Sequence, residues 1–349
     1  MEDLLDKAES KTLGNCLVVG GGGFLGSHIV RRLLERAEKV SVFGRRQYAP
    51  LTAQGVCCIQ GDIVNQAEII AACQGMDTVF HTASLSHMWG RRELLYQVNV
   101  EGCANVIKAC RENCVRRLVY TSSPSVVIGE ENIVNGDESL PYPKQYTADY
   151  PHSKSLAEQL VLAANNRPDK KPRHCQETLL TCAIRPHLIL GPEDPHILPR
   201  LRHAAKKRRL RQIGNGRNQI TITQVENAAH AHILAAVELA GQKRCAGKAY
   251  FIGDSEPIYL WPWLNELLAL WGLPQIKKRV SWGMSRSLAL VSEALHHFMP
   301  WLGEPFMTAF VVDQLARSHS FSHQAASRDF GYEPVVSPEE ALQKLAEWK

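Results

Sequence analysis

Tyr150 and Lys154, in the stretch YPHSK, are the residues whose types and spacing point most directly to catalysis. A spacing of four at the start of a predicted helix places both side chains on one face. A phenol has an unperturbed pKa of about 10 and exchanges protons poorly at neutral pH until a nearby cation stabilises the phenolate. We therefore expect Lys154 to lower the pKa of Tyr150. Tyr146 is the nearest competitor, but another tyrosine follows it four positions later.

Other polar residues are expected to meet this pair. Ser123 follows a predicted strand in YTSSPSVV, and ligands bind where the carboxyl ends of parallel strands meet. Its hydroxyl is placed to hold a substrate carbonyl oxygen beside the phenol. Ser122 and Ser125 are alternatives for this role, and a helix cap or turn is the purely structural alternative. Asn99, in YQVNVEG, is expected to hold Lys154 through its backbone or a water molecule.

A glycine-rich turn indicates a dinucleotide site. Residues 16–26 read CLVVGGGGFLG, a buried strand followed by glycines at the spacing GxxGxxG and then a helix. Such glycines allow a tight turn, close approach of the pyrophosphate and close packing of the helix, whose N-terminus favours an anion. The residues expected to bind the cofactor here are Gly20, Gly23, Phe24, Leu25 and Gly26.

The residues after the predicted second strand favour NADP over NAD. An NAD site usually carries a carboxylate at this point, but the strand ends Phe43-Gly44-Arg45-Arg46. Two guanidinium groups suit a 2′-phosphate, although a solvated arginine pair is the simpler structural alternative. Asp62, after the third strand, either meets the adenine ring or caps a helix.

The elements that must position these residues alternate strand and helix from Cys16 to about Pro186, which predicts a doubly wound parallel α/β sheet of the Rossmann type. The expected strands are Cys16 to Gly20, Lys39 to Phe43, Cys57 to Gln60, Thr78 to His81, Arg117 to Ser122 and Leu179 to Ile184. The expected helices are Phe24 to Arg36, Asn65 to Cys73, Leu94 to Asn113 and Tyr150 to Asn165.

After Pro186 the pattern changes to longer helices broken by prolines, so two domains are predicted. Residues 1–186 form an NADP-binding Rossmann domain with the catalytic residues, and residues 187–349 form a smaller, mostly helical substrate lobe that returns a strand or two to the sheet. We interpret the apolar stretch from Ser281 to Val312 as a helical lid over an apolar pocket or as plain core, in preference to a membrane-surface helix. The residues weighed for binding a substrate carboxylate are His187, His196 and Arg200.

Composition and charge exclude several classes of protein. The 349 residues are 45% hydrophobic and 21% charged, unlike disordered or collagenous chains. The longest uncharged stretch, residues 12–30, contains six glycines, so no transmembrane span is expected. The acidic start MEDLLDKAESK lacks the basic head of a secretory signal, and a cytoplasmic location is expected. A net charge of +5 is too small to indicate nucleic-acid binding.

Weaker signals leave alternatives open. The ten cysteines include no CxxC, so free thiols in a reducing compartment are expected. Residues 202–211, RHAAKKRRLR, are interpreted as the solvated end of a helix, with a docking patch for an acidic partner or an anionic membrane as the alternative. His230 and His232 face different sides of a predicted helix, and no metal is expected. Trp89 and Met88 form either the lip of a lipid pocket or core.

Taken in order, several motifs resemble those of the extended short-chain dehydrogenase/reductases, most closely the 3β-hydroxysteroid dehydrogenase branch. These motifs are GGGGFLG, FHTAS, Asn99, YTSS, YPHSK and IRPHLILGP. Within that branch the chain is most similar to bacterial reductases of 2-alkyl-3-oxoalkanoates in olefin biosynthesis, through GPEDPHILPRL, CAGKAYFIGDSEP and RDFGYEP. Val19 departs from the family, which often has threonine there.

The resemblance implies NADPH-dependent reduction of a long-chain 2-alkyl-3-oxo acid, a lipid-like substrate, to the 3-hydroxy acid. The catalytic residues of the family fall on Tyr150, Lys154, Ser123 and Asn99, and Lys154 is also implied to hold the nicotinamide ribose. A homodimer through helices near 94–113 and 150–165 is implied, within a larger olefin-forming assembly. The alternatives are oxidation of a 3β-hydroxysteroid or sterol-4-carboxylate, and a catalytically silent NADP sensor or scaffold.

Overall fold

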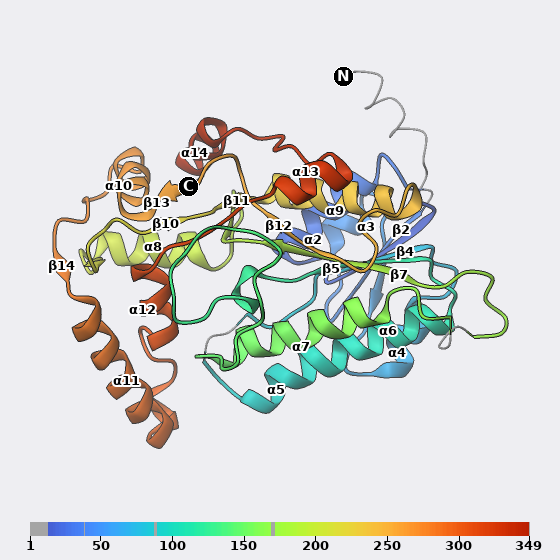
Figure 1. Cartoon of the computed structure of the whole chain (residues 1–349), viewed down its shortest axis with the longest axis horizontal. Helices are drawn as coiled ribbons and strands as arrows, with labels where there is room; N and C mark the ends of the chain where they lie inside the picture. The colour runs from blue at the N-terminus through green and yellow to red at the C-terminus, as the bar shows by residue number, and fades with distance from the viewer. Residues whose placement is uncertain (1–12, 38, 87–88, 169–171, 349) are drawn as a thin grey trace.

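Apolar, β-branched runs form a central sheet of seven parallel strands within the computed structural model, which describes residues 13–37, 39–86, 89–168 and 172–348 (Figure 1). The strand order is β3-β2-β1-β4-β5-β7-β12, so the order reverses beside β1, where ligands bind in such sheets. The strands are β1 Asn15–Val19, β2 Lys39–Gly44, β3 Cys57–Gln60, β4 Thr78–His81, β5 Arg117–Thr121, β7 Leu180–Pro186 and β12 Ala249–Ile252.

Helices cover both faces of this sheet, and a separate apolar cluster fills each side (Figure 1). One face carries α2 Phe24–Leu33, α3 Ala49–Thr52, α9 Val225–Ala240 and α13 Gln324–Phe330. The other carries α4 Gln66–Ala72, α5 Arg92–Tyr96, α6 Gly102–Glu112 and α7 Asp149–Ala164. The predicted doubly wound α/β fold is therefore confirmed.

The six strands predicted from sequence are all present, with ends that differ by no more than two residues. The helix expected from Leu94 to Asn113 is different, because a π-helical segment at Gln97–Glu101 separates α5 from α6. Single-turn π segments are rare and occur frequently at functional sites. Here the segment carries Asn99.

The second half of the chain is mostly helical and has its own apolar cluster. Its helices are α8 Ile197–Lys206, α10 Leu260–Leu270, α11 Trp282–Phe298, α12 Ala309–Ala316 and α14 Pro338–Glu347. A four-stranded sheet has the order β13-β10-β15-β6, formed by Ile258–Tyr259, Gln219–Ile220, His319–Phe321 and Ile133–Gly136. There are also two separate two-stranded sheets. One pairs β8 Ile189–Leu190 with β11 Thr223–Gln224, and the other pairs β9 Gln212–Ile213 with β14 Arg279–Val280.

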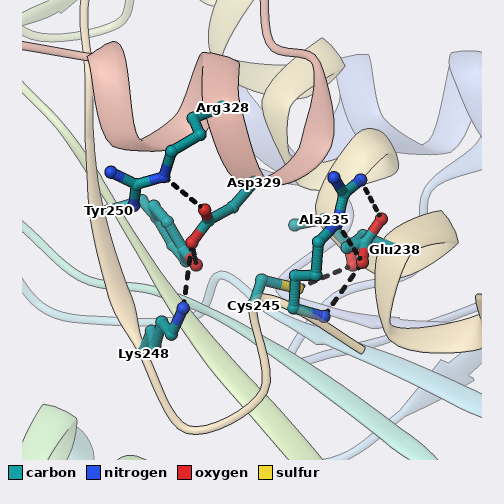
Figure 2. A network of polar contacts seen from close by, with 8 residues as sticks. Ala235, Glu238, Cys245, Lys248, Tyr250, Arg328 and Asp329 are labelled. Atoms are coloured by element: carbon teal, nitrogen blue, oxygen red, sulfur yellow. Dashed lines mark hydrogen bonds and ion pairs between the residues drawn. The ribbon is translucent and has the colours of Figure 1, made fainter. Parts of the chain in front are cut away.

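A buried carboxylate fixes the C-terminal part to the edge of the main sheet. Asp329 of α13 accepts hydrogen bonds from Tyr250 Oη at 2.6 Å and from Lys248 Nζ at 3.0 Å, beside the edge strand β12 (Figure 2). Arg328 Nε reaches the other carboxylate oxygen at 2.8 Å. These charge-assisted bonds attach α13 to a strand that comes from far earlier in the chain.

One sequence interpretation is wrong and another holds only in part. Cys114 and Cys175 form a disulfide, so not all thiols are free, although the other eight cysteines are. The pairing was missed because 61 residues separate the two cysteines. The stretch from Ser281 to Val312 is core only in part, since Ala289 is the one buried residue of α11, whereas Ala309, Phe310 and Val312 of α12 are buried. Among the described residues, no helix combines the length and apolar character needed to cross a bilayer.

Candidate active site

The structure brings Ser123 and Tyr150 together at the carboxyl end of β5. Ser123 lies two residues beyond that strand and caps a short helix at Pro124–Val126, while Tyr150 lies in the first turn of α7. Burial raises the pKa of Tyr150, and its hydrogen bond with Ser123 opposes the rise. The phenol therefore stays protonated at neutral pH, as a proton donor must.

The other two serines have different surroundings. Ser125 Oγ donates to Ser123 Oγ at 2.9 Å, so Ser125 positions the Ser123 hydroxyl. Ser122 is buried, and within the described residues its hydroxyl has no hydrogen-bond partner. Tyr146, the competing tyrosine, donates its hydroxyl to Val126 O at 2.8 Å. Ser123 is thus the serine that meets Tyr150.

Lys154 lies one turn after Tyr150 and is only 2% exposed. Its Nζ donates to Thr121 O at 2.7 Å and lies 4.3 Å from the centre of the Tyr120 ring. Burial lowers the pKa of Lys154 to about 8, because desolvation penalises the ammonium. The expected lowering of the pKa of Tyr150 by Lys154 is not found, since burial and Ser123 are the influences on that phenol.

His232 of α9 holds the threonine that binds Lys154. Its Nδ1 lies 2.7 Å from Ala228 O, and its Nε2 lies 2.8 Å from Thr121 Oγ1. Burial lowers the pKa of His232 to about 4, so the ring is neutral. A carbonyl oxygen only accepts, so Nδ1 carries the proton and Nε2 accepts from the threonine hydroxyl. His230 faces Tyr332 instead, so the two imidazoles do not converge.

Asn99 positions the first turn of α7 but does not contact Lys154 directly. Its Nδ2 donates to Ser153 Oγ and to Leu85 O, each at 3.0 Å, and its Oδ1 accepts from Leu85 N at 2.8 Å. Ser153 Oγ in turn donates to Tyr150 O at 2.8 Å. The π-helical segment therefore connects the loop after β4 with the turn that carries the phenol.

The glycine turn after β1 fits the diphosphate of a dinucleotide. Gly20 has a φ of +86°, and a Cβ there would lie 2.8 Å from Ala83 N. Gly23 is the N-cap of α2 and has no side chain to accept from the first-turn amides, which include those of Phe24 and Leu25. A Cβ at Gly23 would meet, among described atoms, only Gly20 O at 3.2 Å. Open space and free amides at a helix N-terminus form an anion site.

Gly26 serves packing. A Cβ at this position would clash with Gly20 O, so the glycine lets α2 pack closely on the turn. This is the third role expected of the motif.

Arg45 and Arg46 lie next to the glycine turn. They follow β2, which pairs with β1, and Gly20 N donates to Phe43 O at 2.8 Å. Both arginines are exposed. Asp62 follows β3, and its Oδ1 accepts from Val64 N at 3.1 Å.

The alternative prediction, that Asp62 caps a helix, is wrong. The N-cap of α4 is Asn65, whose side chain accepts from Ala67 N. The Asp62 carboxylate instead closes a local turn.

The residues weighed for the substrate carboxylate do not form one group. His187 is buried against His319, with 2.9 Å between its Nε2 and His319 Nδ1. His196 is exposed, and Arg200 pairs with Glu304 at 3.5 Å on the surface. Trp89 contacts His296 of α11 edge to face at 6.3 Å, and Met88 lies outside the described residues.

A buried ion pair beneath the site was missed from sequence. Glu158, one turn after Lys154, accepts from Arg185 Nε at 2.8 Å and Nη2 at 2.6 Å. Tyr142 Oη donates to the same carboxylate at 2.6 Å, and the ion pair raises the pKa of Arg185. An Arg on a strand and a Glu on a helix 27 residues apart give no signal in one sequence.

Comparison with protein families identifies the family. Residues 17–281 match the model of the 3-beta hydroxysteroid dehydrogenase/isomerase family. The chain belongs to this family. It is therefore an oxidoreductase with an extended Rossmann fold, as the resemblance of its motifs implied.

Individual relatives act on two kinds of substrate. A 2-alkyl-3-oxoalkanoate reductase of Shewanella oneidensis is 41% identical over 342 residues, which are 98% of this chain and 87% of the relative. A decarboxylating sterol-4-alpha-carboxylate 3-dehydrogenase of Mus musculus is 39% identical over 335 residues, 95% of this chain and 90% of that one. A structure of the dTDP-glucose 4,6-dehydratase DesIV from Streptomyces venezuelae, with NAD bound, shares the fold at a TM-score of 0.70 and 22% identity, covering 95% of this chain and 96% of that chain.

Proposed function

We propose that this protein reduces a long-chain 2-alkyl-3-oxoalkanoate to the 2-alkyl-3-hydroxyalkanoate with NADPH, in the biosynthesis of an olefin or other hydrocarbon. The observation that carries the proposal is the protonated Tyr150 beside Ser123, with the buried Lys154 one turn away. The identity to the Shewanella reductase over 98% of the chain supports this substrate class.

The chain's own residues supply the proton and its support. NADPH, when bound, supplies a hydride to the ketone carbon. Tyr150 Oη donates a proton to the oxygen as negative charge develops on it, and Ser123 Oγ donates a hydrogen bond to the same oxygen. Lys154, whose ammonium is held by Thr121 O, would bind the nicotinamide ribose. Asn99 acts through Ser153 to orient the turn that carries the phenol.

The preference for NADPH rests on the residues after β2. Arg45 and Arg46 are exposed there, and no carboxylate follows the strand to bond a ribose or repel a phosphate. A charge-assisted hydrogen bond contributes about 1.5–3 kcal/mol, which is roughly a 10- to 100-fold preference. Replacing both arginines with alanine should remove that preference. Equal rates with NADH and NADPH in the unchanged protein would contradict it. Asp62 is proposed to lie near the adenine ring.

Oxidation of a sterol-4-carboxylate or 3β-hydroxysteroid is the second candidate, favoured by 39% identity to the mouse dehydrogenase. The 2-alkyl-3-oxo acid and the sterol-4-carboxylate share one unit, an oxygen-bearing carbon next to the carbon that bears a carboxylate, whereas a 3β-hydroxysteroid lacks the carboxylate. A panel of 2-alkyl-3-oxo acids and 3-hydroxysterols, followed at the nicotinamide absorbance, separates them. We expect turnover of the branched keto acid, and turnover of the sterol alone would overturn the proposal.

The remaining parts of the proposal concern organisation. We propose that residues 1–186 bind the cofactor and carry the chemistry, that residues 187–349 shape the substrate site, and that the chain works in the cytoplasm. Two copies are proposed to pair through α5 to α7, where Leu94 and Leu160 are exposed, within an olefin-forming assembly. The alternative that is not an enzyme is a catalytically silent NADP sensor or scaffold. Any turnover of a keto acid would exclude it.

A further inference from the structure

The helix α11 exposes its apolar side chains and turns its polar side chains toward the protein. Its outward positions, spaced by three or four residues, carry Met284, Leu288, Val291, Leu295 and Phe298, all exposed. Leu288 is 63% exposed, Val291 58% and Phe298 78%. A helix that faces water buries its apolar stripe and exposes its polar one. This face is therefore built for surroundings other than water.

The inward face of α11 explains why the helix lies this way round. Arg286 Nε binds Asp313 Oδ2 of α12 at 3.3 Å, and Trp282 Nε1 donates to Asp313 Oδ1 at 2.7 Å. Glu293 Oε1 accepts from Ala309 N, at the start of α12, at 2.9 Å. These polar contacts fix the rotation of α11 about its axis, so its apolar stripe must point outward.

The apolar surface continues past the end of α11. Met299, Trp301, Leu302 and Phe306 follow the helix and are exposed, Trp301 at 78% and Phe306 at 76%. Figure 1 shows α11 extending beyond the body of the molecule at one end, with α12 beside it. A contiguous apolar surface of this kind marks a contact with a membrane or another macromolecule.

Charge next to the apolar surface decides between those occupants. The short pair β9–β14 brings together the ends of the basic segments 206–211 and 277–279, with Gln212 N bonded to Lys278 O at 2.9 Å. Lys206 to Arg209 and Lys277 to Arg279 are exposed. Residues 195–225 and 274–292 contain no aspartate or glutamate. Because α11 begins two residues after β14, these cations lie at the N-terminal end of the apolar helix.

We propose that α11, the segment 299–306 and the basic segments 206–211 and 277–279 bind the surface of an anionic lipid bilayer. An amphipathic helix buries its apolar face at the boundary of headgroups and acyl chains, and tryptophan is favoured there. Lysine and arginine beside it meet the negative surface potential. A second copy of this chain would carry the same cations and would repel the basic segments. The inference does not rest on the proposed reaction.

Vesicle binding by the full chain tests the apolar part. Vesicles of phosphatidylcholine with one quarter phosphatidylglycerol are sedimented with the protein, and binding is expected. The variant Leu288→Glu with Val291→Glu should lose it. The matched control, Leu34→Glu with Val335→Glu, changes two other exposed aliphatic residues by the same charge and should bind as the unchanged protein does. Equal loss in both variants, or no binding by the unchanged chain, overturns the proposal.

The same vesicles test the electrostatic part. Lys206→Gln with Lys207→Gln should weaken binding about 25-fold, since each cation near a charged membrane contributes roughly fivefold. Lys144→Gln with Lys243→Gln removes the same charge from exposed positions elsewhere and should change binding little. Binding should fall with added salt and on pure phosphatidylcholine. If light scattering instead shows a dimer that Leu288→Glu converts to a monomer, without vesicle binding, the surface joins two copies and the proposal fails.

Discussion

Lys154 should make the folded protein less stable than an apolar residue would. Its pKa falls from 10.5 to about 8 on burial. At about 1.4 kcal/mol per unit this difference amounts to about 3 kcal/mol of unfolding free energy lost at neutral pH. The variant Lys154→Met removes this loss but also removes the bond to Thr121 O, which contributes about 1 kcal/mol. We therefore expect the variant to be more stable by about 2 kcal/mol at pH 7.

The pH dependence of that difference identifies its cause. The pKa of Lys154 is lower in the folded than in the unfolded state, so between about 8 and 10.5 the unfolded chain binds more protons. The stability of the unchanged protein should rise with pH across this window as the amine loses its charge in the folded state. The advantage of Lys154→Met is full below pH 8 and shrinks toward pH 10.5.

Urea unfolding, followed by tryptophan fluorescence at pH 7 and pH 10, measures this difference. The control Lys144→Met removes an exposed lysine and should change the midpoint little at either pH. A Lys154→Met variant less stable than the unchanged protein at pH 7, or a stability difference that is the same at both pH values, would refute burial of the ammonium as the cause. A stabilised but inactive variant would show that the ammonium is kept for chemistry.

Three further predictions follow from neighbouring contacts. Glu158→Leu leaves Arg185 buried without its partner, so urea unfolding should show a loss of about 3–5 kcal/mol. Ser123→Ala removes the hydrogen bond that lowers the pKa of Tyr150, so the alkaline limit of kcat/KM should move to higher pH, and an unmoved limit would contradict the contact. Gly20→Ala places a Cβ on strained backbone 2.8 Å from Ala83 N, so Tm should fall; an unchanged Tm would contradict this.

Local patterns were enough to predict the frame of the site. Buried apolar runs predicted the six strands, and the glycine spacing predicted the turn at Gly20. The spacing of four between Tyr150 and Lys154 placed both on α7, as expected of a helix. Such features depend on residues close in sequence, which is why one sequence reveals them.

Contacts between distant segments were not predictable in the same way. The bonds from Asn99 to Ser153 and from His232 to Thr121 span 54 and 111 residues. The outward rotation of α11 depends on Asp313, which belongs to another helix. Periodicity shows that a helix is amphipathic, but the partners that tertiary structure supplies decide which face is buried.

The central claim is that Tyr150 supplies the proton in a nicotinamide-dependent reduction, and the variant Tyr150→Phe tests it most directly. Oxidation of NADPH is measured with a 2-alkyl-3-oxoalkanoate, and the Kd for NADPH is measured by fluorescence in the same preparation. Loss of a general acid should reduce kcat by about 100- to 10,000-fold while the Kd stays the same. Undiminished turnover in this variant, or a loss explained entirely by weaker NADPH binding, would contradict the account.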